Sequence, residues 1–180
     1  MAKKLNIDIS SETVYTTRSS NEVQDNDAES FTNKLTNVFS ECHRILKNEC
    51  LMIFTYHHSR TEGWTSVYNA ISGANFSISQ VFPIKSEMSV SIPIVKSKEP
   101  INFDLVFVCR KNENYTQNCH VNIENYFCDA INRIESVDLN FSNGDKLIFK
   151  YGLALKKLSE LGEKYIAEDH IVKIFKELNF

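Results

Sequence analysis

The sequence predicts an α/β fold in which a small sheet is flanked by helices and followed by a helical extension. Three patterns support this class: helical apolar spacing in residues 31–46, an unbroken apolar run in residues 50–56, and two later strand-like runs. With 180 residues and 42% hydrophobic side chains, the chain is long enough for one domain with a substantial core.

The first predicted helix covers residues 31–46, where apolar residues recur at the spacing of one helical face. Asp27 or Ser30 is expected to cap its start, because short polar side chains accept the unpaired N–H groups of a first helical turn. Residues 8–30 are rich in Ser, Thr, Asn, Asp and Glu, so residues 1–30 are predicted to form a flexible lead-in, or a loop that a partner orders. The apolar face of the helix consists of Phe31, Leu35, Val38, Phe39, Cys42, Ile45 and Leu46.

Residues 50–56 are apolar without alternation, which is typical of a strand covered on both faces. We therefore expect them to form a central strand of a parallel sheet. A second helix should follow, with Thr61 as its cap, Trp64 on its apolar face and Gly73 as its stop.

Two more strands are predicted, at residues 76–84 and 102–109. No helix fits the Ser-, Pro- and Lys-rich stretch between them, so they should pair antiparallel. The rest of the chain shows helical patterns. The predicted organisation is a lead-in at 1–30, an α/β half-domain at 31–111 and a helical extension at 112–180.

Composition and residue spacing argue against several classes of protein. No apolar run approaches the roughly 20 residues that cross a bilayer, and no secretory signal is visible, so a cytoplasmic protein is expected. The five cysteines lack metal-ligand or paired spacing, which argues against a disulfide framework or a local zinc site. Residues 31–111 hold nine basic and six acidic residues, a surplus too small for tight DNA binding by charge alone.

Several motifs resemble one known family. The helix at 31–46 leads into Leu51-Met52-Ile53-Phe54-Thr55-Tyr56-His57-His58, and Trp64 follows. Further along come Phe82-Pro83-Ile84-Lys85-Ser86-Glu87, then Leu105-Val106-Phe107-Val108-Cys109-Arg110-Lys111, and finally Gly152-Leu153-Ala154-Leu155 with Ser159. Together they resemble the C-terminal part of adenine-specific DNA methylases, the S-adenosylmethionine-dependent amino-methyltransferases that carry zinc-ribbon insertions upstream. The likeness is good over residues 12–111 and looser beyond.

The resemblance implies the C-terminal half of a Rossmann-like methyltransferase sheet. Two signatures of that family are absent from this sequence. The family binds its cofactor with a glycine-rich turn, and it grips the target amine with an Asp-Pro-Pro-Tyr motif. Here the five glycines are scattered and no two prolines are adjacent. The resemblance therefore implies a portion or subunit that is inactive alone and needs an N-terminal half or an upstream-encoded partner. That partner would hold most of the S-adenosylmethionine site, and DNA would bind through the assembled enzyme.

Six residues are candidates for contact with a substrate. His57 and His58 follow the predicted central strand, at the edge where open α/β sheets place ligands. Adjacent strand residues face opposite ways, so at most one of them should face a ligand, and a structural role is the simpler alternative. Trp64 matches a tryptophan of the family, although a lone Trp on a helix usually packs in the core. Lys85, Ser86 and Glu87 lie where the family approaches the target base, unless they only form a solvated loop. No catalytic residue and no metal ligand is expected within this chain.

A function from another class also fits the sequence. A half-sheet leaves an unpaired edge strand, which favours pairing with another chain or with a second copy. The alternative is thus a non-catalytic interaction module derived from a methyltransferase half-sheet, with homo-oligomerisation through that edge.

Overall fold

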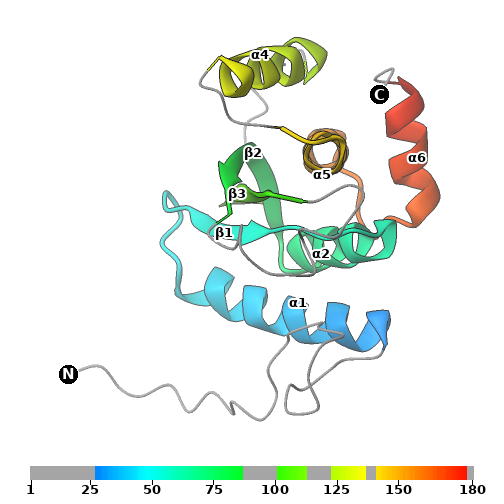
Figure 1. The fold of residues 1–180 in the computed structure, drawn as a ribbon. Helices are drawn as coiled ribbons and strands as arrows, with labels where there is room; N and C mark the ends of the chain where they lie inside the picture. The colour runs from blue at the N-terminus through cyan, green and yellow to red at the C-terminus, as the bar shows by residue number, and fades with distance from the viewer. Residues whose placement is uncertain (1–26, 87–100, 113–122, 137–140, 178–180) are drawn as a thin grey trace, which may run out of the picture.

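The computed structural model describes residues 27–86, 101–112, 123–136 and 141–177. They form a mixed α/β fold, as predicted (Figure 1). Because α1 begins at Ala28, the last residues of the predicted lead-in belong to this helix. Residues 1–26 lie outside the described part. The elements are α1 (Ala28–Ile45), β1 (Met52–Tyr56), α2 (Thr61–Gly73), β2 (Phe76–Lys85), β3 (Phe103–Lys111), α4 (Ile123–Glu135), α5 (Asn143–Glu160) and α6 (Glu168–Glu177).

The described strands form one antiparallel sheet in the order β1-β3-β2. The predicted pairing of the last two strands is confirmed, with Val81 opposite Phe107. The prediction that residues 50–56 form a central strand of a parallel sheet is wrong. β1 lies at the edge of the described sheet and pairs antiparallel with β3. An apolar run shows that a segment favours burial, but it does not show its position in the sheet, and Ile53 in this run is 59% exposed.

A crossover connects the two outer strands. β1 and β2 both run antiparallel to β3, so they run parallel to each other, and α2 joins them. The arrangement is a β-α-β unit with a third strand inserted between its two strands. As a result, the carboxyl ends of β1 and β2 lie at the same edge of the sheet.

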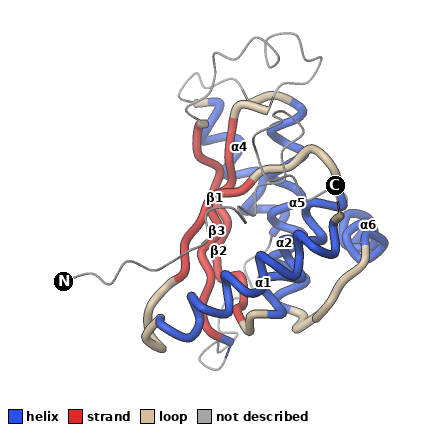
Figure 2. Tube along the Cα trace, turned by 90° about the horizontal axis from the view of Figure 1, so that it is seen from below, coloured by secondary structure: helices blue, strands red, loops and turns tan. Residues whose placement is uncertain are grey.

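The helices α1, α2, α5 and α6 lie on one side of the sheet (Figure 2). The central strand alternates accordingly, since Leu105, Phe107 and Cys109 are fully buried against the helices. The residues between them face the other way. This outer face carries Ile53, Phe82, Ile84, Val106 and Val108, of which Ile53, Phe82 and Ile84 are exposed.

Helix starts differ in how they are capped. The side chain of Asp27 accepts the N–H groups of Glu29 and Ser30 at 3.2 and 3.3 Å, which confirms one of the two expected caps of α1. Thr61 does not cap α2. It is the first helical residue, and the cap position belongs to Arg60, which makes no capping hydrogen bond. Gly73 ends α2 as expected.

α5 packs so closely on the sheet that it belongs to the same core. A Cβ at Gly152 would lie 2.5 Å from Leu105 Cδ1 and 2.9 Å from Val81 Cγ1, so this contact needs glycine. Two turns later the Ser159 hydroxyl accepts the N–H of Ile78 at 2.9 Å, beside an irregularity in the β2 pairing. The motif from Gly152 to Ser159 thus serves packing between helix and sheet.

Candidate functional site: the carboxyl edge of the sheet

The carboxyl ends of β1 and β2 and the amino end of β3 lie together at one end of the sheet, which we call the carboxyl edge. Tyr56 is paired with Leu105, Ile84 with Asp104 and Lys85 with Phe103, so β1 and β2 end where β3 begins. His57 and Ser86 immediately follow these strand ends. In sheets with parallel strands joined by crossover helices, ligands bind at this edge. The structure thus brings His57 to the same end of the sheet as Lys85 and Ser86.

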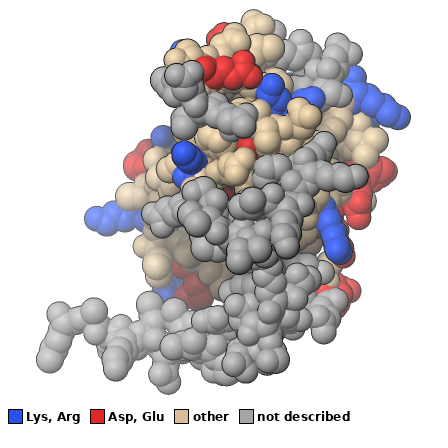
Figure 3. Space-filling model, viewed as in Figure 1, with Lys and Arg blue, Asp and Glu red and all other residues tan. Residues whose placement is uncertain are grey.

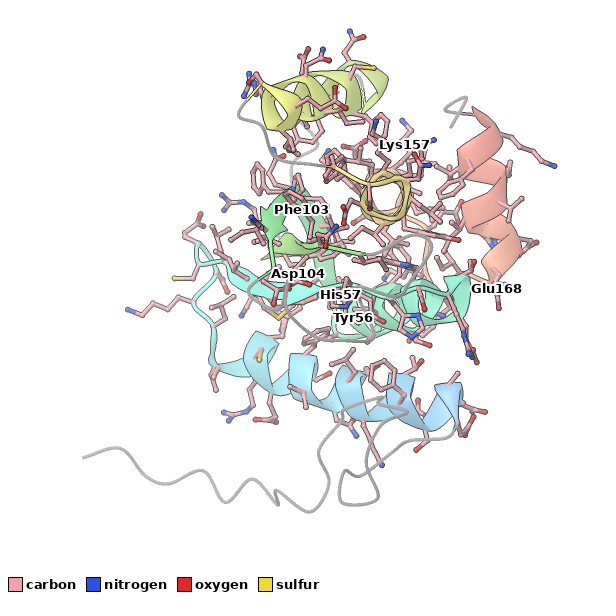
Figure 4. All side chains as sticks on the ribbon, viewed as in Figure 1. Tyr56, His57, Phe103, Asp104, Lys157 and Glu168 are labelled. Atoms are coloured by element: carbon pink, nitrogen blue, oxygen red, sulfur yellow. The ribbon has the colours of Figure 1, made fainter. Side chains whose placement is uncertain are left out.

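His57 and Asp104 form the central polar pair of this edge. Nδ1 of His57 forms a hydrogen bond with a carboxylate oxygen of Asp104 (Figure 4). The imidazole is half exposed and the carboxyl is three-quarters buried. A carboxylate accepts, so Nδ1 carries the proton, and in a neutral ring Nε2 is left as an acceptor. Such a ring can accept a hydrogen bond or a proton from a group that approaches the edge.

Asp104 was not among the candidates from sequence. The signal that could have identified it is a carboxylate near the start of an otherwise apolar strand, Phe103-Asp104-Leu105-Val106. Such a charge is costly inside a sheet unless it has a partner. The partner, His57, is 47 residues away in the chain, and pattern reading does not link the two.

His58 lies on the opposite side of the strand, as the alternation of strand residues requires. Its Nδ1 accepts the N–H of Arg60 at 3.0 Å, and its ring stacks on Tyr56. The ring also lies directly over Gly63, where a Cβ would be 2.4 Å from ring atoms. These contacts fix His58 between β1 and the start of α2, whereas His57 is the histidine with an outward-facing ring.

Trp64 is completely buried. Its indole N–H donates to the carbonyl of His58 at 2.9 Å, and its ring stacks on Tyr151 with centroids 5.4 Å apart. It also meets Tyr56 edge-on at 5.2 Å. Trp64 therefore touches only protein here, and it supports the site by fixing the backbone that follows the histidines.

Lys85 and Ser86 lie at the end of β2. Lys85 is exposed, and the strand register places it on the helix side of the sheet, opposite to Asp104 and His57. The N–H of Ser86 donates to the carbonyl of Asn102 at 2.9 Å, which closes the β2–β3 ladder. Glu87 lies outside the described residues.

A buried carboxylate anchors the start of β3. Asp145, in the first turn of α5, accepts the backbone N–H groups of Asn102 and Phe103 at 2.7 and 3.0 Å. It also accepts the N–H and the hydroxyl of Ser142, as part of a capping box. Because Asp104 directly follows these residues, Asp145 fixes the strand that presents the carboxylate to His57.

Tyr56 connects the edge to α2. Its hydroxyl donates to the carbonyl of Gly63 at 2.9 Å, and burial raises its pKa above the ordinary value of 10.0. The phenol therefore stays protonated at neutral pH. Beside it lies a small hollow, with Phe31, His58 and Ser66 among its lining residues.

The glycines that the structure describes do not form the glycine-rich turn that would bind S-adenosylmethionine, the cofactor that the resemblance implies. Gly63, Gly73 and Gly152 lie in helices, and Gly162, with φ of 74°, follows α5. None of these forms a turn after a strand where a nucleotide could approach the backbone. Across the part of the chain that the structure describes, no cluster of three His, Cys, Asp or Glu residues could hold a metal ion.

No helix among the described residues is long and apolar enough to span a bilayer. Comparisons of the chain with protein-family models, curated proteins and solved structures gave no match.

Proposed function

We propose that this chain is the C-terminal portion or subunit of an S-adenosylmethionine-dependent DNA methyltransferase that acts on the N6 amine of adenine. On its own it is inactive, because the glycine-rich turn and the Asp-Pro-Pro-Tyr motif must come from an N-terminal half or an upstream-encoded partner. The assembled enzyme would bind DNA and act in the cytoplasm.

The β1-α2-β2 crossover is the observation that carries this proposal. β1, α2 and β2 form a parallel unit with β3 inserted, which agrees with the helix, strand, helix and hairpin order of the methyltransferase resemblance. Within the described residues, the outer edge of β1 pairs with no strand. The exposed Ile53 and Ile84 belong to an apolar sheet face. An unpaired edge strand and an apolar outer sheet face are features of a protein that binds a further chain at its sheet.

In the assembled enzyme the chain would form the base-side wall of the site. His57, held by Asp104, lies at the carboxyl edge with Nε2 available for hydrogen bonding. A flipped adenine offers N–H and ring-nitrogen groups to such a wall. His57 is therefore the residue of this chain that we expect to contact the target base, and Asp104 is its positioning residue.

Two measurements test the proposal. Titration of S-adenosylmethionine into the isolated chain should show no binding at micromolar concentrations. Co-expression with an upstream-encoded protein that carries both missing motifs should give a stable complex that methylates DNA adenine. Micromolar cofactor binding by the isolated chain contradicts the proposal, and so does a failure of the two proteins to associate.

The open edge also supports a second candidate, a non-catalytic module that pairs β1 with another protein or a second copy. Here the exposed Ile53 on the edge strand is the favouring observation. This candidate predicts dimers in analytical ultracentrifugation of the isolated chain. Lysine at position 53 (Ile53→Lys) should abolish them, because a charge on an edge strand disfavours pairing. A monomer at high protein concentration contradicts self-association.

A further inference from the structure

The outer face of the sheet is apolar in its middle and carries a charge near each end of β3. Ile53, Phe82 and Ile84 are 59%, 43% and 49% exposed on this face. Asp104 and Arg110 lie on the same face, because alternate residues of a strand point to the same side. The helices α1, α2, α5 and α6 lie on the other side of the sheet (Figure 2). The outer face is therefore accessible to a further protein surface.

The two charges at the ends of β3 have opposite signs. Arg110 is exposed, and its guanidinium forms no ion pair with the residues that the structure describes. Asp104 accepts a hydrogen bond from His57 with one oxygen, and a carboxylate has a second oxygen that can accept another donor. Asp104 and Arg110 are six positions apart, which corresponds to roughly 20 Å along a strand, and Phe107 lies midway between them.

This arrangement is complementary to a second copy of itself. Two sheets that pack face to face lie about 10 Å apart, with their strand directions nearly aligned. A two-fold axis over Phe107, parallel to the sheet and perpendicular to β3, would place Arg110 of each copy opposite the partner's Asp104. If the two β3 strands ran parallel instead, Arg110 would face the partner's Arg110, and like charges disfavour that alignment. The charges thus select the antiparallel alignment.

A second copy fits this face better than a nucleic acid does. Nucleic acids bind surfaces with clustered Lys and Arg, whereas here Arg110 and the His57–Asp104 pair flank apolar side chains. On the side of the molecule seen in Figure 3, Lys and Arg side chains of the described residues are likewise interspersed with Asp and Glu and form no extended basic patch. An apolar centre with a polar rim is typical of protein–protein interfaces.

We propose that the outer face is the interface of a symmetric homodimer, in which two sheets pack face to face and Arg110 of each copy pairs with the partner's Asp104. The exposed Ile53, Phe82 and Ile84 become buried between the two sheets. The proposal does not depend on the methyltransferase function. It also differs from pairing through the edge of β1, because side chains on the sheet face make the contacts and the β1 edge stays open.

Analytical ultracentrifugation of the full chain over a range of concentrations tests the proposal. The wild type should dimerise. Arg110→Glu and Asp104→Lys should each raise the dimer dissociation constant by about a hundredfold, because both symmetric contacts then join like charges. An equimolar mixture of the two variants should dimerise like the wild type, because opposite charges face each other again in the mixed dimer. Lys173→Glu, at an exposed lysine of α6, is the control and should leave the dissociation constant unchanged.

Phe82→Gln should also weaken the dimer, and it leaves the His57–Asp104 pair in place. Thermal melting of each variant verifies that it is folded. Three outcomes would overturn the proposal. They are a wild type that stays monomeric at high protein concentration, a failure of the two folded charge variants to form a mixed dimer, and dimers that Arg110→Glu and Phe82→Gln leave unchanged. The last result would assign self-association to the β1 edge.

Discussion

The buried carboxylate of Asp145 accepts the backbone N–H of Asn102 at 2.7 Å and so fastens the start of α5 to the start of β3. The same carboxylate completes the capping box of α5 through Ser142. One side chain thus organises a helix start and the strand that carries Asp104.

Replacing Asp145 by Asn should lower the free energy of unfolding by about 3 kcal/mol, because an amide NH₂ would then face backbone N–H donors in a site without water access. Urea denaturation measures this effect. Asp169→Asn, at an exposed carboxylate in the first turn of α6, is the matched control and should change stability by less than about 1 kcal/mol. Equal effects of the two substitutions would show that Asp145 is not an anchor.

The His57–Asp104 pair should fix one imidazole tautomer. In the neutral ring, ¹⁵N NMR is expected to show a protonated Nδ1 and an unprotonated Nε2 for His57. Asp104→Asn should shift the ring towards a mixture of tautomers, because the amide can accept or donate at this position. A wild-type spectrum dominated by protonated Nε2 would contradict the geometry of the pair.

Gly152→Ala should destabilise the fold by about 2 kcal/mol, because the new methyl would overlap Leu105 and Val81 in a packed core. Gly73→Ala provides the comparison, since its nearest contact would be Thr36 Cγ2 at 3.3 Å. Thermal unfolding of both variants should show a clear drop in Tm only for Gly152→Ala. If Gly152→Ala melts like the wild type, α5 does not pack as closely on the sheet as described.

Alkaline pH should destabilise the protein through its buried tyrosines. Burial raises the pKa of Tyr68 above the ordinary value of 10.0, with a further contribution from the charge of Glu163, and burial also raises those of Tyr56 and Tyr126. Above about pH 10 the folded state therefore holds more protons than the unfolded state. The stabilisation is complete below that pH and is lost as the pH rises towards the raised values.

Urea denaturation from about pH 8 to about pH 11 measures this loss. Tyr68→Phe should make the profile shallower and should cost stability at neutral pH, because the Tyr68 hydroxyl donates to the carbonyl of Glu163 at 2.7 Å. A profile that is flat up to about pH 11 would contradict the expected titration of these tyrosines.

Thiol labelling should distinguish the cysteines by their burial. Cys50 and Cys128 are exposed and should react within minutes, whereas Cys109 is completely buried in β3. Burial also raises the pKa of the Cys109 thiol above its ordinary value of 9.0, so little reactive thiolate forms. Cys109 should react only at the rate of unfolding. Mass spectrometry of labelled peptides measures these rates, and fast labelling of Cys109 in the native protein would contradict its position.

Local patterns in the sequence were sufficient to predict the helices and strands themselves. The apolar spacing of α1, the cap at Asp27 and the pairing of β2 with β3 depend on neighbouring residues or on a connection that excludes a helix. They could be predicted because helix period, capping and loop length are properties of short segments. The placement of His57 at a strand end also followed from local pattern.

Contacts between distant segments could not be predicted in this way. The insertion of β3 between β1 and β2 turned the expected central strand into an edge strand. The pairing of His57 with Asp104 and the anchoring of β3 by Asp145 both join residues far apart in the chain.

The sequence by itself thus determined which segments are helices and strands, and which motifs are missing, because these depend on residue type and short-range spacing. Only the tertiary structure decided the strand order, the histidine that faces outward and the partner of each buried polar group. These depend on how the whole chain buries its apolar faces and, at the same time, pairs its buried hydrogen-bonding groups.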